Sequence, residues 1–151
     1  MPKGQRPIGR RGDAPDSLFV DSGAWIALVS FRDGRHADAD RLFREAAVRR
    51  LPLITTNLVL AEVHRWLLFH AGVRPALAAL DKLEAGARVT IEFATVEHHL
   101  AARRWLERLV DQRISYTDAV SFAVMQARRC RTALAFDHDF VVAGFELWRS
   151  G

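Results

Sequence analysis

The segment spanning residues 115–140 constrains the fold more than any other part of this 151-residue chain. It opens with a polar Ser-Tyr-Thr-Asp start to an amphipathic helix and passes through a basic turn. It then continues into a short apolar strand, residues 132–136, which ends on Asp137. A helix that begins on a carboxylate and a strand that ends on one predict an acidic pocket where the two ends meet.

The rest of the chain alternates in the same way between short apolar runs and amphipathic helical patterns. Strands are expected at residues 18–20, 51–55, 88–93, 132–136 and 145–148. Helices are expected at about 22–29, 36–50, 57–71, 75–84 and 96–111, and from 115 to the basic turn. Asn57 is a plausible N-cap of the third of these helices, and Leu100 can face the core from the fifth. This alternation predicts an α/β fold with a mostly parallel sheet, because parallel strands need helical crossovers between them.

Five carboxylates occupy corresponding places in this pattern. Asp21 ends the first strand, and Asp137 ends the fourth, with Asp139 two residues later. Glu62 lies near the start of the helix that follows the second strand, and Asp118 near the start of the helix that precedes the fourth. Since sites in such sheets form at the carboxyl ends of the strands, the topology places all five on one rim.

Each carboxylate also has an ordinary structural explanation. Asp21 could cap a helix, Asp118 could complement a helix dipole, Asp137 and Asp139 could be turn residues, and Glu62 could be solvated. Together they would repel one another, and a divalent cation removes that repulsion. Oxygen ligands suit Mg²⁺ or Mn²⁺, which could activate a water towards a phosphodiester. Asp21, Asp118 and Asp137 are the expected direct ligands, whereas Glu62 is expected to ligate through water or position the nucleophile.

Four short segments resemble the acidic motifs of PIN-domain ribonucleases, and of the VapC-type toxins of bacterial toxin–antitoxin pairs in particular. They are residues 20–25, 57–62, 115–119 and 136–140, and the resemblance spans about residues 18–148. It implies a three-layer α/β/α fold, with a parallel sheet of about five strands, and Mg²⁺- or Mn²⁺-dependent cleavage of RNA. It also implies a homodimer that a small cognate, VapB-like antitoxin inhibits.

The resemblance assigns catalytic and metal-binding roles to Asp21, Glu62, Asp118 and Asp137, with Asp139 as an auxiliary or second-metal carboxylate. One position departs from the family pattern. Ala135 stands two residues before the fourth motif's Asp, where the family often has Ser or Thr. A hydroxyl that could bind water or substrate is therefore missing there.

The composition fits one intracellular domain. The net charge is +4, and half of it lies in residues 1–17, which are expected to form a flexible basic tail before a nuclease domain at 18–151. Cys130 is the only cysteine, which excludes an internal disulfide and favours a reducing compartment. Asp21 interrupts the only stretch that resembles a signal peptide, and no apolar run is long enough to span a bilayer, so a cytoplasmic protein is expected.

Two alternatives share the expected fold. One is a housekeeping RNA-processing nuclease without an antitoxin, and the other is a non-catalytic nucleic-acid or protein-binding module that has lost its metal. Four arginines, Arg32, Arg35, Arg65 and Arg113, are expected near the acidic rim, where they could neutralise phosphates. The six histidines lack the spacing of a zinc site.

Overall fold

A parallel β-sheet forms the middle layer of the protein, whose computed structural model describes residues 15–149. The strands are β1 Leu18–Val20, β2 Leu53–Thr56, β3 Val89–Glu92, β4 Thr132–Leu134 and β5 Glu146–Leu147. The helices are α1 Ser22–Val29, α2 His36–Val48, α3 Asn57–Ala71, α4 Val73–Ala85, α5 Val96–Arg108, α6 Tyr116–Ala127 and α7 Asp139–Val142. The predicted tail, residues 1–17, lies outside the described part of the chain except for residues 15–17.

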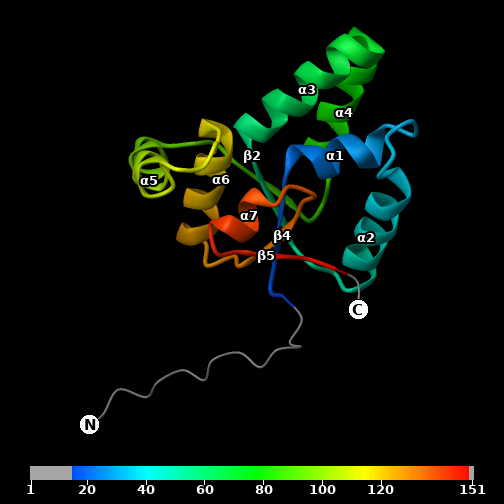
Figure 1. Cartoon of the computed structure of the whole chain (residues 1–151). Coiled ribbons are helices and arrows are strands. Elements are labelled where there is room, and N and C mark those ends of the chain that lie inside the picture. The colour runs from blue at the N-terminus through cyan, green and yellow to red at the C-terminus, as the bar shows by residue number, and fades with distance from the viewer. Residues whose placement is uncertain (1–14, 150–151) are drawn as a thin grey trace.

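The order of the strands, β3-β2-β1-β4-β5, creates a switch point between β1 and β4. From β1 the chain proceeds outward to β2 and β3, and it then returns to β4 on the other side of β1. Right-handed crossovers therefore place the helices that follow these two strands on opposite faces of the sheet. Figure 1 shows α5 and α6 on one side of the sheet and α1 and α2 on the other. The predicted three-layer fold is confirmed, and all strand pairs are parallel.

The core explains why β1 and β4 read as continuous apolar runs. Every residue of these two central strands is buried, because helices cover both faces of the sheet. On the α6 side, the ring of Phe122 packs edge-on against Phe140 with ring centroids 5.3 Å apart, and it also contacts Trp105 and Phe145. On the opposite side, Trp25 of α1 packs against Phe43 of α2.

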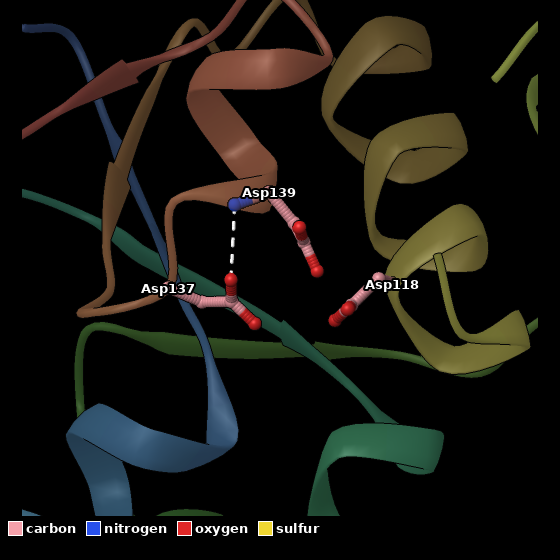
Figure 2. A group of neighbouring side chains, drawn as sticks. All are labelled: Asp118, Asp137 and Asp139. Carbon is pink, nitrogen blue, oxygen red and sulfur yellow. Dashed lines mark hydrogen bonds between the residues drawn. The ribbon is translucent and has the colours of Figure 1, made fainter. Parts of the chain in front are cut away.

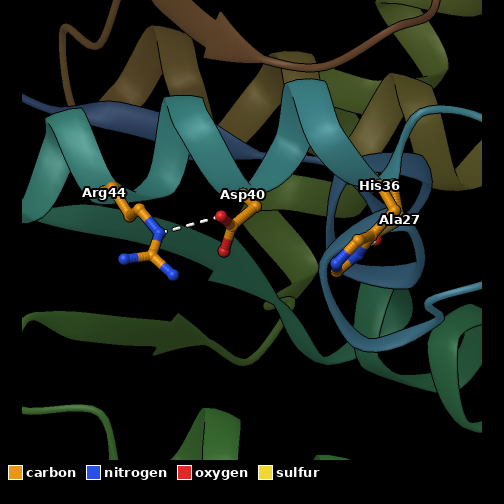
Figure 3. Close-up of polar contacts among 4 residues, drawn as sticks. All are labelled: Ala27, His36, Asp40 and Arg44. Atoms are coloured by element: carbon orange, nitrogen blue, oxygen red, sulfur yellow. Dashed lines mark hydrogen bonds and ion pairs between the residues drawn. The ribbon is translucent and has the colours of Figure 1, made fainter.

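The turn between α1 and α2 is held by a side chain. The Nδ1 atom of His36, at the start of α2, lies 2.7 Å from the carbonyl oxygen of Ala27 in α1 (Figure 3). One turn further along α2, the largely exposed Arg44 forms an ion pair with the partly exposed Asp40, with a Nε–Oδ2 distance of 2.8 Å. The two pairs show that α2 is fixed to α1 at its first residue and presents charge to solvent further on.

Several local predictions are wrong. The N-cap of α3 is Thr56 and not Asn57, because the Thr56 hydroxyl accepts the Val59 N–H at 3.1 Å, while the Asn57 side chain accepts the Ala94 N–H. The last strand residue of β4 is Leu134, and the short helix α7 was not predicted. Leu100, expected to face the core, is 50% exposed. Among the described residues, no helix is long and apolar enough to cross a membrane.

Candidate active site

The carboxyl ends of β1 and β4 meet at the switch point and carry two of the predicted carboxylates. Asp21 directly follows β1, and its N–H donates to the carbonyl of Leu134, the last residue of β4, at 3.2 Å. Asp137 follows three residues after Leu134. Because the chain leaves β1 and β4 towards opposite faces, a crevice-like site at this edge is the position that parallel sheets favour.

Asp118 reaches the same edge from α6. The hydroxyl of Ser115 caps this helix by accepting the Asp118 N–H at 3.1 Å, which fixes the first turn and the Asp118 side chain with it. Asp139 begins α7, and its N–H donates to Asp137 Oδ1 at 2.9 Å. Asp118, Asp137 and Asp139 each offer an oxygen, and these three atoms lie within 4.8 Å of one another. Figure 2 shows the three side chains directed into a common space.

Asp21 contributes a buried oxygen that lacks a partner. The residue is 5% exposed, and its Oδ1 atom has no hydrogen bond to any described residue. It occupies the N-cap position of α1, but its side chain does not form the capping bond that the sequence allowed. A buried, unpaired carboxylate oxygen is costly and rare in folded proteins. A bound cation at this position would satisfy it.

The electrostatic coupling of Asp21 extends across the site. Burial raises the pKa of Asp21 from its ordinary value of 3.8 to about 7, although the Ser22 N–H opposes this shift. The negative charges of Glu62, Asp137 and Asp139 raise it further. Asp21 is therefore partly protonated near neutral pH unless a cation stabilises its charge.

Asp118 behaves in the same way, and two more carboxylates are affected. Burial raises the pKa of Asp118 to about 7, with further contributions from Asp21, Asp137 and Asp139. The pKa of Asp139 is raised by desolvation and then by Asp137. The pKa of Glu62, whose side chain still reaches solvent, is raised by partial desolvation and by Asp118. Each of the five predicted residues thus raises the pKa of at least one of the others.

The structure brings these five residues together to different degrees. Asp118, Asp137 and Asp139 form a group with ligand spacing, whereas Asp21 and Glu62 are linked to them through charge. Carboxylate oxygens without sulfur or imidazole partners are the donor set of Mg²⁺ and Mn²⁺. A carboxylate cluster in which the pKa values of Asp118 and Asp139 are raised, together with the orphaned oxygen of Asp21, fits such an ion.

One residue that supports the site, Thr55, was not predicted from the sequence. The Thr55 hydroxyl, fully buried in β2, donates to the carbonyl of Val20 at 3.0 Å and accepts the indole N–H of Trp25 at 3.3 Å. These bonds hold the corner between β1 and α1 that carries Asp21. A threonine in an apolar strand is the only signal in the sequence, and it is a common one. Ala135 is 1% exposed, so the missing hydroxyl of the family pattern corresponds to a buried methyl group beyond β4.

A parallel sheet with a cluster of carboxylates at its switch point defines a class of α/β proteins in which such a cluster could hold a metal ion. The model of the PIN domain matches residues 18–146, and the chain belongs to this family. A relative from Mycobacterium tuberculosis, the 23S rRNA-specific endonuclease VapC20, is 38% identical over 128 residues, which cover 85% of this chain and 95% of VapC20.

Solved structures agree with this assignment. The crystal structure of VapC20, described as a sarcin–ricin loop cleaving toxin, matches with a TM-score of 0.78 and 37% identity and covers 85% of this chain and 96% of that one. The crystal structure of VapBC2 from Rickettsia felis, bound to promoter DNA, matches with a TM-score of 0.65 over 87% of this chain and 96% of that one. At 15% identity, the second likeness shows the fold alone.

Proposed function

We propose that this protein is an endoribonuclease toxin of a toxin–antitoxin pair and hydrolyses RNA with Mg²⁺ or Mn²⁺ held by its clustered carboxylates. The observation that carries the proposal is the convergence of Asp118, Asp137 and Asp139 at the switch point, beside the orphaned oxygen of Asp21. The 38% identity to a ribosomal RNA endonuclease supports the reaction class. Binding of a metal to this site would occur with the carboxylates deprotonated.

The five carboxylates would have different roles, according to their positions in the site. Asp118, Asp137 and Asp139 would hold the cation, and the buried Asp21 would add an oxygen and exclude bulk water from that side. Glu62, at the exposed edge, would ligate through water or orient the attacking water. A divalent cation supplies Lewis acidity there, lowering the pKa of a bound water and neutralising charge that develops on the phosphodiester.

The proposed substrate is a structured hairpin of large ribosomal RNA. VapC20 is named for its action on 23S rRNA and described as cleaving the sarcin–ricin loop, and this chain covers almost the whole of VapC20. A protein that cuts ribosomal RNA must meet ribosomes, so we expect it to act in the cytoplasm.

A small VapB-like antitoxin is the proposed inhibitory partner. An apolar groove of about 880 Å³ lies between the end of α1 and the α3–α4 helix pair, and Phe31 and Trp66 are among its lining residues. Such a groove suits the apolar face of a partner helix. Further exposed apolar side chains, Phe93, Val96 and Leu100, lie at or before α5 and could serve the expected homodimer. Light scattering with and without the protein encoded beside this gene measures both assemblies.

The test of the enzymatic proposal is cleavage of a synthetic sarcin–ricin hairpin in the presence of Mn²⁺ or Mg²⁺. The unmodified protein should cut it, EDTA should abolish cutting, and Asp118→Asn should reduce the rate by at least a hundredfold. Asp81→Asn, which neutralises an exposed aspartate on α4, is the matched control and should retain activity. Equal rates for Asp118→Asn and the unmodified protein would remove Asp118 from the active site.

A further inference from the structure

A second, basic pocket lies beside the acidic site, and we propose that it binds a phosphate of the RNA substrate next to the one that is cleaved. We call it the arginine pocket; its volume is about 300 Å³, and it is lined by Arg35, Asp38, Arg41, Leu42, Phe136 and Arg149. The proposal rests on the proposed function and adds a substrate-binding site to it.

The position of the pocket follows from the chain itself. Phe136 forms part of its wall, and the next residue is Asp137 of the acidic cluster. Consecutive Cα atoms are about 3.8 Å apart, so the two sites share a stretch of backbone. An RNA strand carries a phosphate at every nucleotide. A strand that presents one phosphodiester to Asp137 therefore has a neighbouring phosphate within reach of the pocket.

Arg35 is positioned in advance for such a contact. Its guanidinium carbon lies 4.9 Å from the centroid of the Phe136 ring, and its Nη1 donates to the Phe136 carbonyl at 3.4 Å. A guanidinium has five N–H donors in a planar fork that matches a phosphate. Only the bond to Phe136 engages the Arg35 guanidinium within the described part of the chain. Its other N–H donors remain available to a ligand. Contact with the Phe136 ring restricts the conformations of the Arg35 side chain, so less conformational entropy is lost when a ligand binds.

The charge balance of the pocket favours an anion. Among the described residues that line the pocket, there are three guanidinium groups and one carboxylate, Asp38. Asp38 pairs with Arg41 at 3.4 Å; both side chains are more than half exposed, and pairs of this kind contribute little. Arg149 forms no hydrogen bond or ion pair with any residue in the range 15–149. By contrast, Arg128, which does not line the pocket, forms an ion pair with Glu92. The arginine pocket thus supplies attraction beside carboxylates that would repel RNA.

A carboxylate-bearing segment of a protein partner would also suit these guanidinium groups. The position of Phe136 favours the substrate, because this lining residue directly precedes Asp137 of the proposed reaction centre. The two possible ligands lead to different expected results. Loss of a phosphate contact changes the KM for RNA and its salt dependence, whereas loss of a contact with the protein partner changes inhibition by the antitoxin.

The test compares Arg35→Ala, Arg149→Ala and the double variant with the unmodified protein. Arg44→Ala is the control, because this substitution removes the same charge from the helix that carries Arg41. Arg44 itself does not line the pocket and pairs with Asp40 (Figure 3). The assay is steady-state cleavage of the sarcin–ricin hairpin with Mn²⁺ at several salt concentrations. Asp38→Asn removes the one carboxylate among the described residues that line the pocket and should act in the opposite direction.

Arg35→Ala and Arg149→Ala should each raise KM roughly three- to tenfold. The value of kcat should be nearly unchanged, because exposed charge contacts contribute modestly to binding. The double variant should also reduce the slope of log(1/KM) against log[salt] by about 0.7–0.9 for a lost phosphate contact. Arg44→Ala should match the unmodified protein, and Asp38→Asn should lower KM. The conservative variant Arg35→Lys should recover the salt slope but only part of the affinity.

Unchanged KM and salt slope in the double variant would overturn the proposal, as would a change only in inhibition by the antitoxin. If the unmodified protein cuts no RNA, the proposed function fails separately. In that case anisotropy of the labelled hairpin, measured in the Asp118→Asn background, still tests the pocket through binding alone. Equal affinity with and without Arg35 and Arg149 would then reject it.

Discussion

Replacing Asp21 with Asn should stabilise the metal-free protein, although Asp21 belongs to the proposed active site. Asp21 is 5% exposed, its Oδ1 has no hydrogen bond among the described residues, and its pKa is raised to about 7 from 3.8. The folded state therefore holds a proton that the unfolded state releases near pH 4. Unfolding free energy consequently falls as pH rises from about 4 to about 7, by about 1.4 kcal/mol per unit.

The size of the effect follows from this shift. The charge of Asp21 should cost the folded protein about 4 kcal/mol at pH 8 and about 1.5 kcal/mol at pH 5. Asn has a similar shape and no charge, but its amide still lacks a full set of partners. We therefore expect Asp21→Asn to raise the free energy of unfolding by about 2–4 kcal/mol at pH 8, or roughly 8 °C in Tm. At pH 5 the increase should be about 1 kcal/mol or less.

Thermal and urea unfolding in EDTA at both pH values provide the measurement, with Asp81→Asn as an exposed control that should change little. Saturating Mn²⁺ should reverse the order, since the ion stabilises only the protein that retains the full ligand set. A loss of stability in Asp21→Asn at pH 8 without metal would refute the reasoning. It would mean that the Asp21 charge is compensated in the folded protein.

Three further outcomes follow from the same structure. Metal binding should strengthen as pH rises from 6 to 8 and should release protons, because Asp21 and Asp118 must deprotonate; calorimetry in two buffers of different ionisation enthalpy measures the protons. Thr55→Val should lower the free energy of unfolding by about 1–3 kcal/mol in urea titrations, because the buried indole N–H of Trp25 loses its acceptor. Phe122→Ala should cost about 3–5 kcal/mol in the same assay, because Phe122 is fully buried among aromatic rings.

The sequence predicted the large features of this protein because they follow from periodicity. Apolar runs that end on Asp21 and Asp137 identify the ends of parallel strands, and the sheet rule then places their carboxylates at one edge. The strand order was not predictable in this way. Only the structure shows that β1 and β4 are neighbours at the switch point, which explains why the carboxylates after these two strands meet.

The local features that the sequence did not predict correctly depend on contacts made by side chains after folding. Thr56 and Asn57 are both good caps, and the choice between them is made by a tertiary contact, the acceptance of the Ala94 N–H by Asn57. The arginine pocket also joins distant segments, with Arg35 beside Phe136, and no spacing in the sequence reveals that contact. Burial of the Asp21 oxygen without a partner likewise emerges only after packing.

The central claim is that the clustered carboxylates bind a divalent cation where RNA is cut. Anomalous diffraction from crystals grown with Mn²⁺ tests it most directly. The expected result is a manganese peak bounded by the carboxylates of Asp118, Asp137 and Asp139, and loss of that peak in crystals of Asp118→Asn. A protein that cleaves the hairpin while its manganese lies elsewhere, or is unaffected by Asp118→Asn, would contradict the account.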